Sequence, residues 1–558
     1  MTTTSRTLLA MLASLAAAVP AAARVTRTGV SAGSDVFLRG PGTGGAAGSS
    51  TDPAVSADGR DVVFPSTAPN PVSGANTVSD AATPRPDSLD DQWATLFGIT
   101  SPPAAPEGDR QTNAAQENAV TNPALPFKRY LAEGATGPFF ATRLSLANPD
   151  GANAANVVLT FDSGSGTTRT LPLSLVAGGT AFVDVGTISG FESSDVSTTI
   201  ESDRLVVVDR MMEWGIDPAT GHGYGSSMET SAAAPSTTWF LAEGSTVLGF
   251  DLYYLLQNPQ PTIANVTVRY LLSSGTVITR NYSMAPHSRT TIYVNVIPGI
   301  EETDVSGDIT ANVPIIVERS MYRNAPGQYY GVGTASRGVT APATRWFLAE
   351  GATGTWFDLF VLFANPGATE AHITAEYAKE DGTVVTRNYV VGAHTRFSVY
   401  VDSIPGLTDT SVATTVTSTV PIVVERAMYW PGTFFNYYEG HTSVGTTDTA
   451  QRWVIAGGDG DPGTYTFVLL ANTDTRPGQA ELRIMSPSGF VPSLRRLVNL
   501  PPNSRTTVSL SGMPPHYGVL VTSSGPSPVE LVVESAVYRD FGGLLWASGA
   551  NAVATPLP

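Results

Sequence analysis

The chain contains no cysteine and only two lysines, Lys128 and Lys379, among its 558 residues. The absence of cysteine excludes disulfide bonds, thiolate metal sites and cysteine nucleophiles. Charge is also scarce, since 14% of the residues are charged, against about 25% in a typical globular chain. The net charge of −17 argues against nucleic acids and anionic membrane surfaces as partners, because both bind clustered Lys and Arg.

Long apolar runs are missing from the chain after its N-terminal segment. None of the later apolar runs approaches the roughly 18 residues of a transmembrane helix. The N-terminus itself has Arg6, an apolar run over 8–19 and three alanines before Arg24. This pattern is typical of a secretory signal peptide. We therefore expect residues 1–23 to be removed, leaving an extracellular or periplasmic protein without a membrane span.

What the chain does contain is a fourfold internal repeat. The segment Trp239-Phe-Leu-Ala-Glu-Gly recurs at 129–134, at 346–351 and, weakened, at 453–458, with spacings of 110, 107 and 107 residues. Asn-Pro pairs and segments related to Val-Glu-Arg keep similar steps. Fixed periods of this kind indicate a repeat architecture. We place the repeats at 128–235, 236–342, 343–450 and 451–558.

Within each repeat, short strands alternate with turn residues and no helical period is present. The strands predicted in the second repeat are 239–242, 251–257, 265–272, 277–284, 290–296, 305–311 and 315–322. Seven short strands in about 105 residues are typical of an immunoglobulin-like β-sandwich, so the predicted fold is an all-β tandem array of four such repeats. A propeller with two blades per repeat is the alternative. The Gly- and Ala-containing segments 331–343 and 440–450 favour linkers between separate beads of a rod.

Charged residues vary together from repeat to repeat. Repeats one to three carry Glu in the first strand and Arg in the last, as Glu133 with Arg210, Glu243 with Arg319, and Glu350 with Arg426; repeat four has Gly457 and Ser535. Loss of one partner of a buried ion pair costs about 3–5 kcal/mol, so joint loss indicates a structural pair within each repeat rather than a site.

A weaker second set pairs Asp251 with Arg289 and Asp358 with Arg396. In repeat one both charged residues are replaced, by Ala141 and Gly178. Repeat four has Tyr465 in place of the acid but keeps Arg505, so the two positions do not always change together.

Residues 24–127 differ from the repeats and form a small irregular region of a hairpin and short helices. Strand-like segments at 34–39 and 62–64 flank Ser56-Ala-Asp-Gly59, and this piece resembles one blade of a TolB-like propeller. One blade cannot close a propeller, so 24–80 is predicted to be a vestigial hairpin region.

A short helix is predicted at 87–98, within a linker covering 81–127. Glu107-Gly-Asp109 and the residues after it resemble a thrombospondin type-3 calcium linker. The linker departs from that pattern at Arg110, and calcium needs six to eight oxygen ligands. We therefore predict a degenerate loop that retains Glu107 and Asp109 as calcium candidates, and no other cofactor.

The blade, the linker and the repeats, with Ala364–Pro366 and Val424–Tyr429 as their most specific motifs, resemble uncharacterised secreted proteins of the acidobacterial type. The resemblance implies export and tandem repeats, and it implies no reaction.

Minimal motifs of zincins, serine hydrolases and P-loop enzymes are missing, which favours a protein that is not an enzyme. One aromatic cluster is a candidate sugar-stacking platform or, alternatively, a packing surface between repeats; its members are Trp430, Phe434, Tyr437 and Tyr438. The predicted function is a secreted, monomeric structural or adhesion protein whose partner is an unknown protein or glycan. An array of carbohydrate-binding modules and the accessory region of a secreted hydrolase are the alternatives.

Overall fold

The computed structural model of the chain describes residues 54–55, 62–63, 125–431, 437–510 and 512–558. The chain falls into two units, Met1–Asp87 and Ser88–Pro558. In the first unit, β1 (Ala54–Val55) pairs antiparallel with β2 (Val62–Val63), inside the region predicted as a hairpin. The predicted signal peptide, the 87–98 helix and the calcium candidates Glu107 and Asp109 lie outside the described residues.

The prediction of an all-β fold is confirmed for the second unit, whose described residues form strands joined by turns and four short 3-10 helices. These helices are η1 (Val185–Thr187), η2 (Val247–Gly249), η3 (Val294–Val296) and η4 (Val401–Ser403). Within the described ranges, no helix has the length and apolar character needed to cross a membrane.

The second repeat shows the plan that the others follow. Its strands are β11 (Ser236–Leu241), β12 (Phe250–Asn258), β13 (Ala264–Leu272), β14 (Val277–Met284), β15 (Ser288–Tyr293), β16 (Val305–Ala325) and β17 (Gln328–Arg337). The first half of β16 pairs with β11 and β13, and β14 extends that sheet. The second half pairs with β12 and β17, and β15 extends this second sheet. A single strand of 21 residues therefore belongs to two antiparallel sheets.

The other repeats have equivalent strands. Those of repeat one are β3 (Phe127–Leu131), β4 (Phe140–Ala147), β5 (Ala155–Asp162), β6 (Thr168–Leu175), β7 (Thr180–Asp184), β8 (Ser197–Ser202), β9 (Val207–Asp217) and β10 (His222–Thr230). Those of repeat three are β18 (Ala343–Leu348), β19 (Asp358–Asn365), β20 (Ala371–Lys379), β21 (Val384–Val391), β22 (Thr395–Tyr400), β23 (Val412–Trp430) and β24 (Glu439–Val444). Those of repeat four are β25 (Arg452–Gly458), β26 (Thr464–Asn472), β27 (Gly478–Ser486), β28 (Gly489–Leu500), β29 (Ser504–Ser509), β30 (Tyr517–Ser524), β31 (Leu531–Phe541), β32 (Leu544–Val553) and β33 (Thr555–Pro556).

Each repeat has a core between its two sheets, built from the inward residues of alternating strands. In β13 every second residue is buried, including Val266 and Val268, because successive side chains of a strand point to opposite faces. Trp239 of the repeated motif is 1% exposed and donates its indole N–H to the backbone oxygen of Ile315 at 2.9 Å. Trp346 and Trp453 are equally buried. The tryptophan of the motif is therefore a core residue with its polar atom satisfied.

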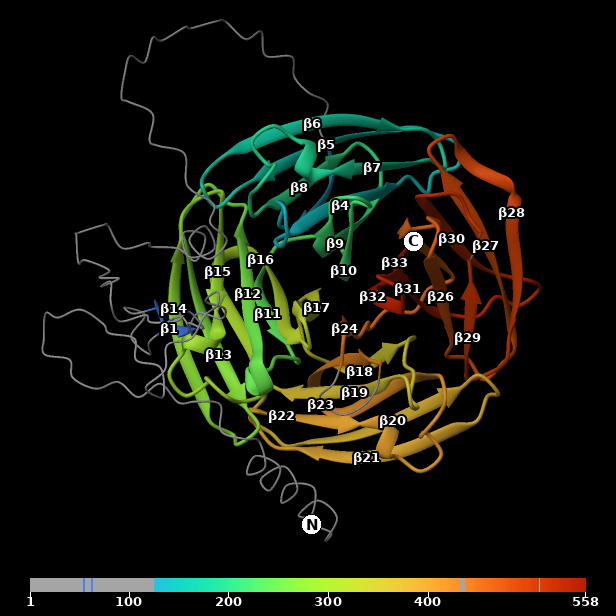
Figure 1. Ribbon diagram of the computed structural model, residues 1–558. Helices are drawn as coiled ribbons and strands as arrows, with labels where there is room; N and C mark the ends of the chain where they lie inside the picture. Colours follow the sequence, from blue (N-terminus) through green and yellow to red (C-terminus); the bar gives the residue numbers. More distant parts are fainter. Residues whose placement is uncertain (1–53, 56–61, 64–124, 432–436, 511) are drawn as a thin grey trace, which may run out of the picture. The chain divides into compact units, whose positions relative to one another are not determined.

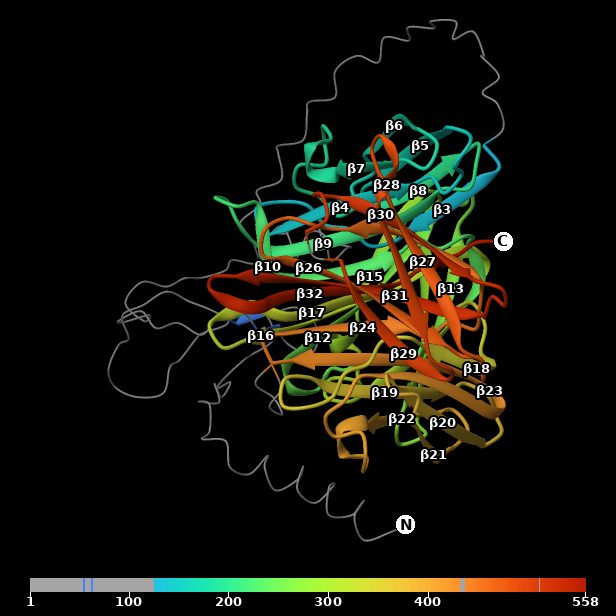
Figure 2. The same ribbon diagram turned by 90° about the vertical axis from the view of Figure 1, so that its right-hand side faces the viewer.

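The four repeats of the second unit stand around a common axis (Figure 1). One strand from each repeat lies at the centre, and β10 and β24 each contact both β17 and β32. In the side view these four strands run side by side (Figure 2). The fourth repeat thus returns to the first and closes a ring.

The segments predicted as linkers, 331–343 and 440–450, contain parts of the central strands β17 and β24 instead. A Cβ atom added to Gly333 would lie 2.4 Å from the ring of Trp214 in repeat one. A Cβ atom on Gly549 would lie equally close, at 2.4 Å, to the ring of Trp430 in repeat three. Glycine is required at these positions because aromatic rings of a neighbouring repeat pack directly on the backbone. The small residues mark close contact between repeats rather than flexible spacing.

The prediction of separate beads in a rod is wrong. One hydrophobic cluster contains Tyr130 of repeat one, Trp239 of repeat two and Tyr429 of repeat three, so apolar packing continues across the joints. The arrangement combines features of both predicted alternatives. Each repeat is a unit of two sheets, and the four units are placed around an axis in a propeller-like manner (Figure 1).

Candidate functional site

Buried carboxylates and guanidinium groups meet at the joints between consecutive repeats. Between repeats one and two, Arg210 Nη1 lies 2.5 Å from Glu318 Oε2, and Glu318 Oε1 accepts the backbone N–H of Ala132 at 2.7 Å. The equivalent pairs at the next joints are Arg319 with Glu425 at 2.7 Å and Arg426 with Glu534 at 2.9 Å. All six side chains are buried. Each pair therefore joins two repeats at a place that water does not reach.

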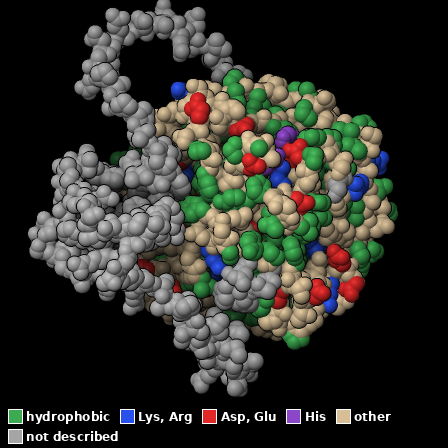
Figure 3. Space-filling view, viewed as in Figure 1, with side chains coloured by type: hydrophobic (Ala, Val, Ile, Leu, Met, Phe, Trp, Pro, Cys, Tyr) green, Lys and Arg blue, Asp and Glu red, His purple; other side chains and the backbone are tan. Residues whose placement is uncertain are grey.

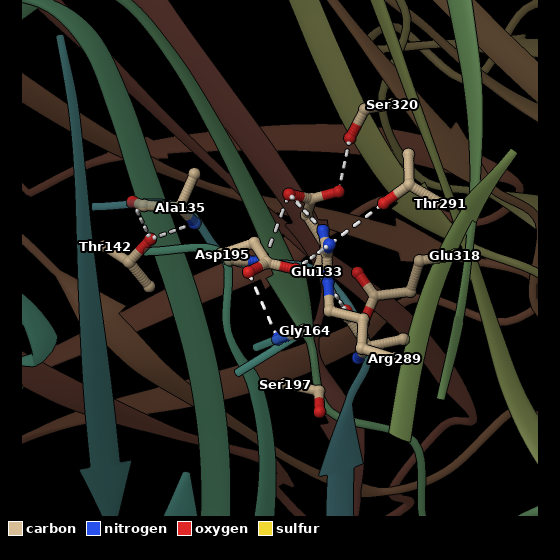
Figure 4. Close-up of polar contacts among 12 residues, drawn as sticks. Glu133, Ala135, Thr142, Gly164, Asp195, Ser197, Arg289, Thr291, Glu318 and Ser320 are labelled. Carbon is tan, nitrogen blue, oxygen red and sulfur yellow. Dashed lines mark hydrogen bonds and ion pairs between the residues drawn. The ribbon is translucent and has the colours of Figure 1, made fainter. Parts of the chain in front are cut away.

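A second carboxylate lies beside each of these pairs. Arg289 Nη2 is 3.6 Å from Glu133 Oε1, and Arg289 also contacts Asp195 at 2.6 Å and the backbone oxygen of Ala132 at 3.0 Å (Figure 4). The equivalent contacts are Arg396 with Glu243 at 3.2 Å and Arg505 with Glu350 at 3.9 Å. The same arrangement of acids and arginines is thus repeated at three joints, and both neighbouring repeats contribute side chains to each.

Of the three ion pairs predicted inside the repeats, these contacts correct two and confirm the third. Arg210 and Arg319 donate to the backbone oxygens of Glu133 and Glu243, at 2.9 and 2.7 Å, while their carboxylate partners belong to the next repeat. Glu350 and Arg426 do approach each other, at 3.3 Å. A contact inside a repeat and a contact between neighbouring repeats recur with the same period along the sequence. Covariation therefore identified the charged residues but not their partners in the next repeat.

Asp251 and Asp358 were expected to pair with Arg289 and Arg396, and this prediction is wrong. Tyr293 Oη donates to Asp251 at 2.5 Å and Tyr400 Oη donates to Asp358 at 2.7 Å. The strand register explains the error, because Arg289 lies opposite Gln257. Asp251 is six residues away from Gln257 along β12, a distance of about 20 Å.

The aromatic cluster at the end of repeat three is packed rather than free. Trp430 is 0% exposed and donates its indole N–H to the backbone oxygen of Trp546 at 2.8 Å. Tyr437 is buried, stacks on Tyr429 and donates to Asp358. Tyr438 is partly buried against the hydrophobic core. Phe434 lies outside the described residues. Buried rings cannot stack on a sugar, so Trp430 and Tyr437 serve the packing between repeats.

The axis of the ring is occupied by a carboxylate that sequence analysis missed. Glu439 is fully buried at the start of β24, and its two oxygens accept backbone N–H groups of Ser226, Gly333 and Gly440 at 3.0, 3.2 and 2.8 Å. A fourth hydrogen bond comes from the backbone of Gly549. One carboxylate thus binds the central strands of all four repeats. The strand register aligns Glu439 with Gly225, Val332 and Ser548 of the other repeats, so repeat three alone has an acid at this position. Because the acid does not recur, comparison of the repeats could not identify Glu439.

The joint between repeats four and one lacks most of this charge. Asp209 takes the place of Glu318, and its Oδ2 accepts the backbone N–H groups of Ala456 and Gly457 at 2.7 and 3.0 Å. Ser535 stands where the other repeats have arginine, and Gly457 stands where they have glutamate. The strand register shows that Thr180, rather than Gly178, occupies the position in repeat one that Arg289 occupies in repeat two. The loss of charge is therefore coordinated across one joint.

A cavity of about 370 Å³ lies at this fourth joint. Its charged lining residues are Asp184, Asp209, Glu213, Asp459, Asp461, Arg143, Arg539, His222 and His516. Arg143 is 2.5 Å from Glu213, and Arg539 is 2.6 Å from Asp459. Both arginines of the wall are therefore already paired with acids.

Burial raises the pKa of four carboxylates at the joints. It raises the pKa of Glu133 and Glu350, against the opposing charge of their arginine neighbours. Burial raises the pKa of Glu243 to about 7, although Arg396 and Arg319 lower it. The pKa of Asp209 is also raised by burial, against its two backbone hydrogen bonds and the nearby Thr230 hydroxyl. These groups hold protons more firmly than exposed carboxylates do.

A metal centre is not present among the described residues, where no three His, Asp or Glu side chains are placed to share an ion. The signal that could have identified the joint network was present in the sequence. Repeat four keeps Glu534 although its neighbour is Ser535, which indicates that the partner of Glu534 lies in the preceding repeat.

No protein-family profile matches the chain, and no curated protein does. Among solved structures, the crystal structure of Thermotoga maritima 1070 is similar with a TM-score of 0.18 and 14% identity, over 19% of this chain and 94% of that chain. A tetra-tandem repeat in the extending region of a large adhesion protein has a TM-score of 0.09 and 14% identity, over 74% of this chain and 94% of that chain. Both scores are too low to transfer a fold or a function, so function is argued below from the residues of the chain itself.

Proposed function

We propose that the chain is a secreted, non-enzymatic structural or adhesion protein, in which four immunoglobulin-like repeats form one rigid ring. The observation that carries the proposal is the use of buried acids and arginines at three joints. These groups bind each other across the joints and fix neighbouring repeats in one orientation. Buried charges need such partners, since an unpaired one is strongly destabilising.

Further features support the details of this proposal. The two antiparallel sheets of each repeat support the immunoglobulin-like assignment. The N-terminal pattern supports export to the cell surface, the extracellular matrix or the periplasm. The central strands of the second unit pack on one another within one chain, which supports a monomer.

The proposal is tested in the organism that produces the protein. Immunoblots of cytoplasmic, surface and medium fractions should find a processed chain outside the cytoplasm. Cells lacking the gene should adhere less to surfaces or to one another, and the purified full chain should restore adhesion, whereas the heat-unfolded chain should not. An unprocessed cytoplasmic chain, or adhesion that is unchanged in the deletion strain, would contradict the proposal.

A further inference from the structure

The fourth joint contains a cavity beside a buried acid, Asp209, that lacks the arginine partner found at the other three joints. The cavity of about 370 Å³ lies within the range of roughly 300–1,000 Å³ that is usual for small-molecule sites. Figure 3 shows a histidine with acidic and basic side chains around it on this face, in the sector between repeats one and four.

Comparison of the joints shows which group is missing. Glu318, Glu425 and Glu534 each bind a guanidinium group from the preceding repeat, at 2.5, 2.7 and 2.9 Å. Asp209 occupies the same position in repeat one, but the residue that would supply its guanidinium group is Ser535. Among the residues that the structure describes, Asp209 has no ion-pair partner.

Asp209 is also incompletely hydrogen-bonded. Its side chain is 3% exposed and lines the cavity, and Oδ2 accepts two backbone N–H groups. Oδ1 accepts no hydrogen bond of normal geometry from the described residues, although the Thr230 hydroxyl and the Arg129 guanidinium group act on the carboxylate. A buried polar atom without a partner is rare in a native structure, and a ligand is one cause of such an atom.

The remaining wall favours a cation with an apolar body. Five carboxylates line the cavity against two arginines, and both arginines are engaged by Glu213 and Asp459. Phe182, Met211, Met228 and Val537 supply apolar surface. A site with surplus negative charge attracts positively charged ligands, and its low polarity elsewhere suits a short alkyl chain.

We propose that this cavity binds a small organic cation, an alkylguanidinium, whose planar head group lies beside Asp209 as arginine side chains lie beside Glu318, Glu425 and Glu534. A guanidinium group can direct one N–H donor at Oδ1, the oxygen of Asp209 that accepts no backbone N–H, while its charge offsets that of the carboxylate. The proposal is independent of the structural role proposed above, because it concerns the one joint at which Ser535 replaces the arginine of the repeated network.

Isothermal titration calorimetry of the full chain tests the proposal with three probes of matched length, namely n-butylguanidinium, n-butylammonium and the neutral n-butylurea. We expect n-butylguanidinium to bind most tightly and n-butylurea to bind about tenfold more weakly or worse, because the neutral urea cannot form an ion pair with a carboxylate. Equal affinity for the urea, or no heat from n-butylguanidinium at millimolar concentration, overturns the proposal.

Two variants locate the ligand. Asp209→Asn should lose about tenfold or more in affinity for n-butylguanidinium. Ser535→Arg should also abolish binding, because it supplies a tethered guanidinium group at the proposed position. Asp217→Asn, on the same strand but outside the cavity, is the matched control and should bind as the native chain does. Circular dichroism checks that each variant is folded. If Asp209→Asn does not fold, Ser535→Arg decides alone, and unchanged binding in a folded Ser535→Arg variant refutes the site.

Discussion

At the scale of single residues, the joints depend on carboxylates that are buried together with their arginine partners. Arg319 binds Glu425 and the backbone of Glu243, and it also donates to the hydroxyls of Ser336 and Thr442. Several of its N–H donors are thus satisfied by groups from two repeats. Removing a partner at such a site leaves a buried charge without compensation.

Replacement of Arg319 by Met should destabilise the protein by about 3–5 kcal/mol, because Glu425 then remains buried and unpaired. The double variant Arg319→Met/Glu425→Gln should lose less than the sum of the two single changes, since neither charge remains. Chemical denaturation measures the free energies of unfolding. Arg495→Met, which breaks an exposed pair with Glu481, is the control and should change stability by less than about 1 kcal/mol. Strict additivity at Arg319 and Glu425 would contradict their coupling.

A second prediction concerns pH. The pKa of Glu243 is about 7 in the folded chain, against an ordinary value of 4.5, and the pKa of Glu229 is also about 7. Between about pH 4.5 and about pH 7, these two side chains bind more protons in the folded chain than in the unfolded chain. Their contribution to the free energy of unfolding therefore falls as pH rises. For Glu243 the full change corresponds to about 3 kcal/mol.

The native chain and Glu243→Gln should therefore differ in the pH dependence of their stability. From about pH 5 to about pH 7 the native chain should lose more stability than the variant, whose side chain does not titrate. Denaturant midpoints at several pH values measure this difference. Glu301→Gln, at an exposed position, should keep the native profile. Parallel profiles for the native chain and Glu243→Gln would rule out the raised pKa.

At the scale of strands, alternation of apolar residues predicted most elements of the repeat correctly. The predicted strands 265–272 and 277–284 match β13 and β14 closely. The strands expected at 305–311 and 315–322 are one strand, β16, although Pro314 lies between them. Proline lacks the N–H that a sheet ladder needs. It is tolerated here because residues 312–314 pair with neither sheet, at the point where β16 passes from one sheet to the other.

The central strands could not be predicted from their own segments. β17 and β24 contain glycine and small polar residues that are typical of linkers, and their partners are strands of other repeats. These segments are buried only because the four repeats close into a ring, and the residue pattern within a segment does not predict that closure. The Asn of each Asn-Pro pair, by contrast, has a local role, since Asn258 donates to the backbone oxygens of Thr262 and Ala285 at 2.9 and 2.8 Å.

Replacement of Gly333 by Ala should disturb the centre of the ring, because the added methyl group would overlap the ring of Trp214 in repeat one. Overpacking of this kind costs about 1–3 kcal/mol. The loss is measured by thermal or chemical denaturation, together with near-ultraviolet circular dichroism of the tryptophans. Gly151→Ala, where the nearest atom is 3.4 Å away, is the control and should be tolerated. Native stability of Gly333→Ala would contradict the close packing of β17 on repeat one.

At the scale of the whole ring, the repeats depend on one another. Val532 and Ala536 of repeat four belong to the same hydrophobic cluster as Trp346 of repeat three. Another cluster joins Val207 of repeat one to Val454 of repeat four. Repeat four therefore covers apolar surface on both of its neighbours.

Deletion of residues 451–558 should therefore unfold or aggregate the remaining three repeats rather than leave three stable domains. Glu439 would lose a hydrogen bond from β32, and apolar surface of repeats one and three would be exposed to water. Size-exclusion chromatography and hydrogen exchange measure the outcome, with the undeleted chain as the reference. A monomeric, protected three-repeat chain would show that the repeats fold independently.

The fourth joint also determines the order of assembly. Its contacts connect residues as far apart as Asp209 and Ala456, and no short connector holds repeats four and one together as neighbours in the chain. Pairs of that sequence separation form late, since the intervening chain must be ordered first. During synthesis, Val207 and Asp209 of repeat one therefore remain uncovered until the last repeat has been made. The interval before this closure is the period in which the nascent chain is most exposed to aggregation and most dependent on chaperones.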